Sequence, residues 1–163
     1  DVVLETKLPT FGICFGHQLL AYHLGTPVNT NREQAEIGTI DVHLTEKGVS
    51  DPVFGQLSAT FKAHTGHSDH ADEVPPGVEL LATSERLRTQ AFRVRGAPFY
   101  TTQFHPDLNG IDAVTRYRSF RAAAPEPGDE PMPPSTELFD PRADSSTGLL
   151  GWFFDDVMSG RHE

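Results

Sequence analysis

The sequence has a single cysteine among its 163 residues, and it contains no long apolar run. One cysteine cannot form an intramolecular disulfide, which favours a reducing compartment. No apolar run approaches the roughly 20 residues that a membrane-spanning helix needs, and residues 1–8 lack the basic and apolar layout of a signal peptide. We therefore expect a cytoplasmic protein that does not cross a membrane.

Basic side chains are also scarce, since 13 Lys and Arg residues stand against 23 Asp and Glu residues, for a formal net charge of −10. Binding to a phosphate backbone requires clustered cations. Four arginines that are close together in the sequence fall around a predicted hairpin, and they are Arg86, Arg88, Arg93 and Arg95. We expect no nucleic-acid partner.

The chain divides by composition into three parts. Residues 1–123 mix strand-like and helical segments without internal repeats, which predicts one α/β domain. Residues 124–147 are rich in proline, which is excluded from helix interiors and central strands, so we expect an arm or loop. Residues 148–163 predict an apolar helix that packs on the domain or on a partner through Trp152, Phe153 and Phe154. The arm could contact a second copy of the chain, so a homo-oligomer is one open alternative.

The segments of the first part follow recognisable periodicities. The sequence predicts helices at residues 15–24 and 112–123, and extended segments at residues 9–13, 37–44, 60–64 and 78–82, followed by a hairpin of residues 89–95 and 98–104. The eight residues before Pro9 are too few for a strand–crossover–strand unit. We therefore expect the first strands of such a domain to be missing from this sequence.

The residues Gly12-Ile13-Cys14-Phe15-Gly16 have the form G-x-C-x-G between a predicted strand and a predicted helix. This is the cysteine form of a nucleophile elbow, in which the flanking glycines permit close backbone approach. A thiol at a helix N-terminus lies among free N–H groups that favour the thiolate. The pattern predicts that Cys14 is a nucleophile and that the N–H of Phe15 faces a developing oxyanion.

A thiolate nucleophile needs a proton shuttle, and His105 is placed to be one. It follows the apolar strand that ends in Gln103-Phe104, at the edge of the sheet where α/β proteins present loop residues. Asp107 is close enough to orient the imidazole. The three residues Cys14, His105 and Asp107 therefore predict a Cys-His-acid arrangement.

These motifs resemble those of the class I glutamine amidotransferases. The segment Gly-Ile-Cys-Phe-Gly-His-Gln-Leu-Leu-Ala at residues 12–21 is similar to the nucleophile motif of that family, and Gln-Phe-His-Pro-Asp at residues 103–107 is similar to its second signature. Further segments at residues 35–38, 51–54 and 76–84 resemble the branch that contains the amidotransferase domain of GMP synthase. The resemblance covers residues 9–108.

The resemblance implies a fold, a reaction and a set of roles. The fold would be a flavodoxin-like α/β domain with a mixed, mostly parallel sheet flanked by helices. Cys14 would attack the side-chain amide of glutamine, with His105 as acid–base, and the ammonia would pass to a synthetase domain or subunit. Glutamine would be held by Gln18 and by the loop Gly66-His67-Ser68-Asp69. No cofactor and no metal are implied.

The sequence departs from the family pattern at one position, because Asp107 stands where glutamate is usual. Two other functions stay open. A γ-glutamyl hydrolase or peptidase-like cysteine hydrolase would use the same elbow, and a catalytically silent regulatory or binding homologue would keep the fold alone.

Several polar residues have simpler interpretations. His64, His67 and His70 could suggest a zinc site, but the intervening Thr65-Gly66 favours a loop over a helix that would gather them. His17 is expected to be structural, and His23 to pack near the core. Arg32 and Glu36 are expected in a solvated loop with at most a surface ion pair.

Overall fold

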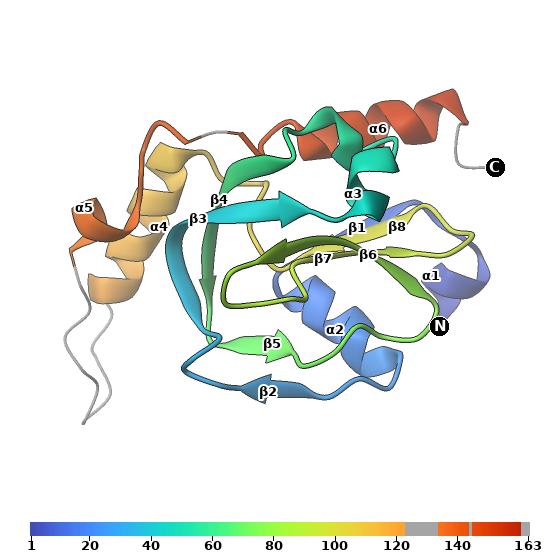
Figure 1. Cartoon of the computed structure of the whole chain (residues 1–163), viewed down its shortest axis with the longest axis horizontal. Helices are drawn as coiled ribbons and strands as arrows, with labels where there is room; N and C mark the ends of the chain where they lie inside the picture. The colour runs from blue at the N-terminus through green and yellow to red at the C-terminus, as the bar shows by residue number, and fades with distance from the viewer. Residues whose placement is uncertain (123–133, 144, 161–163) are drawn as a thin grey trace.

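The computed structural model describes residues 1–122, 134–143 and 145–160, and its centre is a six-stranded sheet (Figure 1). The strand order across this sheet is β1-β8-β7-β6-β3-β4, and a second small sheet pairs β2 with β5. The strands are β1 (Thr10–Ile13), β2 (Val28–Thr30), β3 (Glu36–Leu44), β4 (Thr60–His67), β5 (Asp69–Ala71), β6 (Val78–Ser84), β7 (Ala91–Val94) and β8 (Phe99–Thr102).

The large sheet is mixed, as expected, but most of its pairs are antiparallel. Only β1 and β8 run parallel among the described pairs, whereas β8–β7, β7–β6, β6–β3 and β3–β4 are antiparallel. The expectation of a mostly parallel sheet is therefore wrong for these strands. The physical reason lies in the connections, because β6, β7 and β8 follow one another through short turns, which produce antiparallel neighbours. One of these turns contains Gly96 with a φ of 70°.

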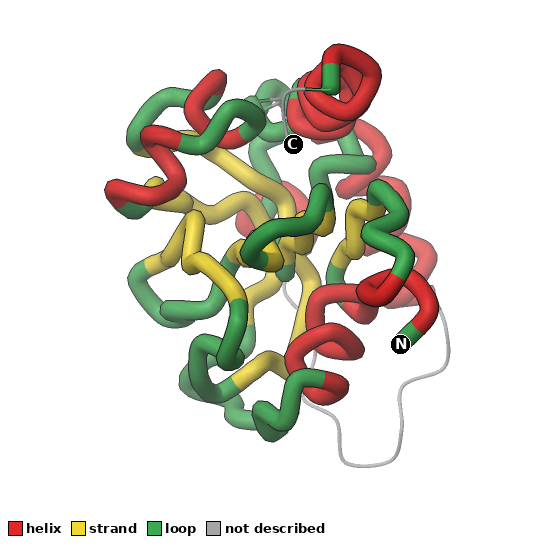
Figure 2. The backbone as a smooth tube through the Cα atoms, turned by 90° about the vertical axis from the view of Figure 1, so that its right-hand side faces the viewer, coloured by secondary structure: helices red, strands yellow, loops and turns green. Residues whose placement is uncertain are grey.

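Helices lie on both faces of the sheet. They are α1 (Val2–Glu5), α2 (Phe15–His23), α3 (Glu46–Ser50), α4 (Gly110–Ala122), α5 (Ser135–Leu138) and α6 (Leu149–Ser159), with a 3-10 turn η1 (Phe54–Gln56). Figure 1 shows α2 below the sheet and α6 above it, and Figure 2 shows the strands between peripheral helices. Among the described residues, no helix combines the length and the apolarity that crossing a membrane requires.

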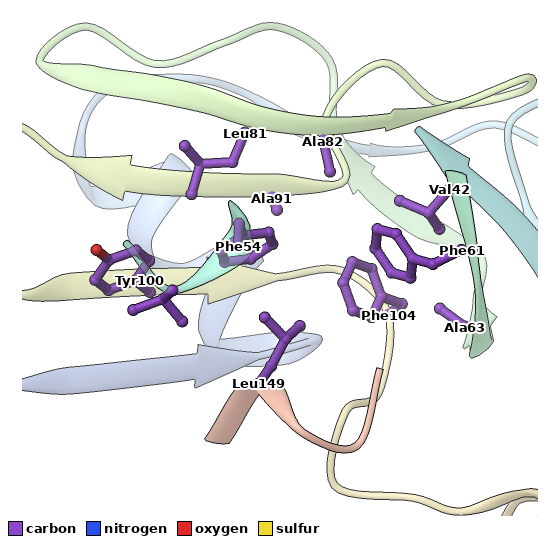
Figure 3. Close-up of a cluster of buried hydrophobic side chains, with 11 residues drawn as sticks. Val42, Phe54, Phe61, Ala63, Leu81, Ala82, Ala91, Tyr100, Phe104 and Leu149 are labelled. Carbon is purple, nitrogen blue, oxygen red and sulfur yellow. The ribbon is translucent and has the colours of Figure 1, made fainter. Parts of the chain in front are cut away.

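The larger part of the core lies between the sheet and α6 (Figure 3). Aromatic side chains fill much of it, with Phe153 of α6 packed edge-on at 5.4 Å from Phe11 and at 5.7 Å from Tyr100. Trp152 packs against the same cluster, whereas Phe154 is 60% exposed. The C-terminal helix predicted from the sequence therefore packs on the domain's own sheet through two of its three aromatic residues.

Part of the proline-rich segment is ordered against the sheet. Residues 123–133 and 144 lie outside the described residues, but residues 134–143 contain α5 and run beside β3 and α4. Two glycines make room for this arm. Gly38 has a φ of 127°, and a Cβ there would overlap the carbonyl of Leu138, while a Cβ at Gly110 would overlap the backbone of Pro141. The absence of two side chains thus sets the path of residues 134–143.

Candidate active site

The strand-to-helix turn predicted at Cys14 is present. β1 ends at Ile13, α2 begins at Phe15, and Cys14 between them is the N-cap residue with a φ of 50° and a ψ of −96°. A residue other than glycine at positive φ stores strain, which is typical of functional turns. The N–H of Cys14 donates to the carbonyl of Thr102 at 2.7 Å, so the turn is fixed to β8.

Gly12 has the predicted purpose, whereas a Cβ at Gly16 would meet no atom within 4 Å. A Cβ at Gly12 would lie 3.1 Å from the backbone carbon of Gly16 and 3.0 Å from the Thr101 side chain, so strand and helix approach closely here. The side chain of Phe15 is 72% exposed. Its N–H is among the first of α2, which have no partner inside a helix, and this leaves a donor beside the cysteine. That this N–H faces an oxyanion stays a prediction.

His105 follows β8 and is only 7% exposed. Its backbone N–H donates to the carbonyl of His64 in β4 at 2.8 Å, which positions the residue. Its ring Nδ1 lies 3.0 Å from Oδ1 of Asp107. The aspartate that stands where glutamate is usual therefore reaches the imidazole in spite of its shorter side chain.

The electrostatics of His105 follow from its neighbours. Burial lowers the pKa of His105, but hydrogen bonds to Asp107 and to Cys14 outweigh the burial and raise the pKa to about 9. The hydrogen bond from His105 lowers the pKa of Asp107 below its usual value, against the effect of burial. At neutral pH the imidazole is therefore protonated, and it contacts a carboxylate on one side and the cysteine on the other. Such a contact is how cysteine nucleophiles are activated.

A hydrogen-bonded pair of glutamines continues the site. Gln103 is fully buried, and its Nε2 lies 3.6 Å from Sγ of Cys14. Nε2 of Gln18 donates to the Asp69 carbonyl at 2.7 Å and to Oε1 of Gln103 at 3.3 Å. The structure thus brings the predicted Gln18 and Asp69 together near Cys14. Sequence reasoning missed Gln103, although its position two residues before His105 was a usable signal.

The predicted loop at residues 66–69 is a tight connection between strands. Gly66 and His67 end β4, Ser68 is the single linking residue, and Asp69 begins β5. Gly66, His67 and Ser68 line a cleft of about 240 Å³ together with His105.

The opposite wall of this cleft comes from α4 and the arm, through Arg116, Tyr117 and Phe139. Nη1 of Arg116 lies 3.4 Å from Nδ1 of His105. The sequence predicted the helix that carries Arg116 but did not indicate that Arg116 lies at the site. That wall depends on contacts between α4 and the arm, which no local pattern encodes.

The expectation for Glu36 is wrong. Glu36 is 5% exposed rather than solvated, and its carboxylate contacts His67, Ser84 and Gln90. The reason is that β3 lies between β4 and β6, which bury the residue at the start of the strand.

The other histidines have separate environments. His17 is structural as predicted, with its ring nitrogens 2.8 Å from Oγ1 of Thr101 and 2.9 Å from the Thr89 carbonyl, and burial lowers its pKa to about 3. His23 does not pack in the core as expected; it is exposed and pairs with Asp1 at 3.1 Å. His64 contacts Oγ1 of Thr39, and His70 lies 3.5 Å from the Asp72 carboxylate.

The family model "Glutamine amidotransferase class-I" matches residues 2–116. The chain is 34% identical over 120 residues to the glutamine-hydrolysing GMP synthase subunit of Thermococcus kodakarensis, covering 71% of this chain and 60% of that protein. It is also 34% identical over 108 residues to the corresponding GMP synthase subunit of Methanocaldococcus jannaschii, covering 66% of this chain and 55% of that protein. The chain therefore spans little more than half the length of these relatives.

Solved structures share the fold. A glutamine amidotransferase from Thermotoga maritima superposes with a TM-score of 0.75 at 21% identity, covering 96% of this chain and 65% of that one. A glutamine amidotransferase from Methylobacillus flagellatus superposes with a TM-score of 0.73 at 19% identity, covering 98% and 66%. At these identities the likeness concerns the fold alone, and it extends over the arm and α6 as well as residues 2–116.

Proposed function

Since the chain belongs to the class I glutamine amidotransferase family, we propose that it hydrolyses the side-chain amide of glutamine and releases ammonia. The observation that carries this proposal is the contact of His105 with both Cys14 and Asp107. A nucleophile on a strained turn, a base beside it and an acid that orients the base are what acyl transfer from an amide requires.

In the proposed mechanism, Sγ of Cys14 attacks the amide carbon of glutamine while the N–H of Phe15 donates to the developing oxyanion. His105 gives its proton to the leaving nitrogen, and ammonia departs from a γ-glutamyl thioester. His105 then takes a proton from water, which cleaves the thioester to glutamate and restores the cysteine. Asp107 keeps the proton on Nδ1 throughout, so that the other ring nitrogen faces the sulfur.

The substrate and the acceptor are also part of the proposal. Gln18 and the backbone of residues 66–69 hold the amino-acid end of glutamine, and the cleft beside His105 gives access to the site. The ammonia passes to an acceptor on a synthetase domain or subunit. Support comes from the relatives in Thermococcus and Methanocaldococcus, which are glutamine-hydrolysing subunits of GMP synthase. The reaction at Cys14 needs no cofactor.

Ammonia release from glutamine is the direct test, measured on the protein as its gene encodes it and on its Cys14→Ala variant. We expect turnover that disappears with the cysteine. Faster cleavage of γ-glutamyl peptides than of glutamine would instead identify a γ-glutamyl hydrolase. A folded protein that cleaves neither substrate, alone or with a synthetase subunit, would contradict the proposal.

A further inference from the structure

The carboxylate of Glu36 is buried, and three described side chains that can donate hydrogen bonds contact it. Oγ of Ser84 donates to its Oε1 at 2.7 Å, Nε2 of Gln90 donates to its Oε2, and Nε2 of His67 lies 3.3 Å from the same oxygen. The side chain of Glu36 is 4% exposed and that of His67 is 1% exposed. Three groups that can donate hydrogen bonds, from β4, β6 and the residue before β7, therefore converge on this one side chain.

Both ring nitrogens of His67 face acceptors. Nε2 faces the Glu36 carboxylate, and Nδ1 lies 3.1 Å from the carbonyl oxygen of Asp69. His67 therefore bridges the Glu36 carboxylate and the Asp69 carbonyl through its two ring nitrogens, and its buried side chain is held between them.

The same carbonyl of Asp69 also receives Gln18. Nε2 of Gln18 donates to the Asp69 carbonyl at 2.7 Å and to Oε1 of Gln103 at 3.3 Å. Because the Asp69 carbonyl can only accept, this contact decides which end of the Gln18 amide carries the nitrogen. The amide oxygen of Gln18 is turned the other way, and it has no hydrogen-bond partner among the described residues.

We propose that Glu36 and His67 are positioning residues that act through the Asp69 carbonyl to hold the Gln18 amide with its oxygen toward the α-ammonium group of the bound glutamine. The inference rests on the proposed function and deepens it. A fixed acceptor for a substrate cation distinguishes glutamine from amides that lack the α-amino group. The discrimination thus originates in two buried side chains, Glu36 and His67, that do not themselves touch the substrate.

The variant Glu36→Gln removes the charge while keeping the shape of the side chain. The substituted amide can turn its NH2 group toward Nε2 of His67, which weakens the contact that holds the ring between residue 36 and the Asp69 carbonyl. Once that carbonyl is free to move, the Gln18 amide is free to turn. The variant Asp51→Asn is a matched control, because Asp51 is another buried carboxylate whose contacts among the described residues are with Arg93, Tyr100 and the backbone of Val53 and Phe54.

The experiment measures binding rather than turnover. Calorimetric dissociation constants are compared for glutamine and for glutaramate, which is glutamine without its α-amino group, in the Cys14→Ala background. Ammonia release by the unmutated protein tests the proposed function separately, so the two failures can be told apart. A hydrogen bond to a charged group predicts that glutamine binds about 10- to 100-fold more tightly than glutaramate.

The expected result is that Glu36→Gln reduces this preference to within about threefold by weakening glutamine binding, while Asp51→Asn leaves it unchanged. If Glu36→Gln fails to fold, His67→Gln removes the ring that joins Glu36 to the Asp69 carbonyl and is expected to give the same loss of preference. Equal losses in Glu36→Gln and Asp51→Asn would show a structural role alone and overturn the inference. So would a Cys14→Ala protein that binds glutamine no better than glutaramate, or binds neither.

Discussion

Glu36 and Asp51 are both buried carboxylates with a full set of partners, yet their contacts lead to different parts of the molecule. Oδ1 of Asp51 accepts the N–H groups of Val53 and Phe54 at 2.9 Å, and its Oδ2 lies 3.1 Å from Arg93 and 3.2 Å from the Tyr100 hydroxyl. Every one of these partners belongs to the framework around η1, β7 and β8. The contacts of Glu36 lead through His67 and Asp69 to Gln18 and the cysteine.

Burial and complete hydrogen bonding therefore do not by themselves indicate function. Both carboxylates would lose several contacts on substitution, and both would be expected to destabilise the fold. Only the path of contacts from Glu36 ends at groups that face the substrate in the proposed mechanism. Substitutions in the site and in the framework should therefore differ in whether they reduce activity or stability.

The largest difference between the effect on activity and the effect on stability is expected at Cys14. Replacing it with alanine removes the nucleophile, so ammonia release should fall by about a thousandfold or more. The melting temperature should change little, because within the described part of the chain the thiol makes a long contact to Gln103 and a contact to His105. An assay of ammonia release beside a thermal melt checks both statements. Residual turnover near the original rate would show that a residue other than Cys14 is the nucleophile.

Asp51→Ala should instead reduce stability and leave the activity nearly unchanged. The variant leaves the N–H groups of Val53 and Phe54 without their acceptor and Arg93 without its counter-charge, which predicts a loss of about 3 kcal/mol in the free energy of unfolding. Urea denaturation measures the loss. The KM and kcat for glutamine should stay within about twofold of the original values; a selective rise in KM would mean that the framework and the site are not separable.

The protonation of His105 predicts a dependence of stability on pH. Its pKa in the folded protein is about 9, above the usual value near 6.5. The stabilisation is therefore complete below about pH 6.5 and is lost as pH rises through 9, because the folded state binds more protons than the unfolded state in this window.

We expect the free energy of unfolding of the original protein to fall by about 1 to 2 kcal/mol more than that of His105→Gln between pH 6.5 and 9, after allowance for partial solvent screening. Urea titrations at both pH values measure the difference. Parallel pH profiles for the two proteins would show that His105 is not protonated in the folded state.

The smallest effect is expected at an exposed carboxylate. Nζ of Lys62 lies 2.8 Å from Asp41, and about half of each side chain is exposed. Lys62→Ala should change the free energy of unfolding by less than about 0.5 kcal/mol, because water already solvates both charges. A change of the size predicted for Asp51→Ala would show that burial is not what distinguishes these carboxylates.

The sequence predicted the parts of the site that local patterns encode. A strand, a glycine-flanked cysteine and a helix lie within residues 10–23, so the elbow at Cys14 could be placed from spacing alone. His105 and Asp107 were found because both follow directly from one strand. The contact of this pair with Cys14 joins residues that are about 90 positions apart, and there the family resemblance supplied what spacing could not.

Glu36 shows why the rest could not be predicted. Its own charge and its closeness to Arg32 indicated a solvated loop, but its partners His67, Ser84 and Gln90 lie 31, 48 and 54 residues away. The burial follows from the strand order of the sheet. The same limit applies to β2 and β5, which were not predicted, because each has only three residues and is held by pairing with the other.

The two glycines beneath the arm have a consequence for saturation mutagenesis. Any side chain at Gly38 or Gly110 would collide with the backbone of residues 134–143 and displace Phe139 from the wall of the cleft. A mutational map scored only by growth would therefore mark both positions as intolerant as Cys14, although neither takes part in the proposed chemistry. Scoring the same library for protein abundance would separate them, because the glycine variants would be depleted and the cysteine variants would not.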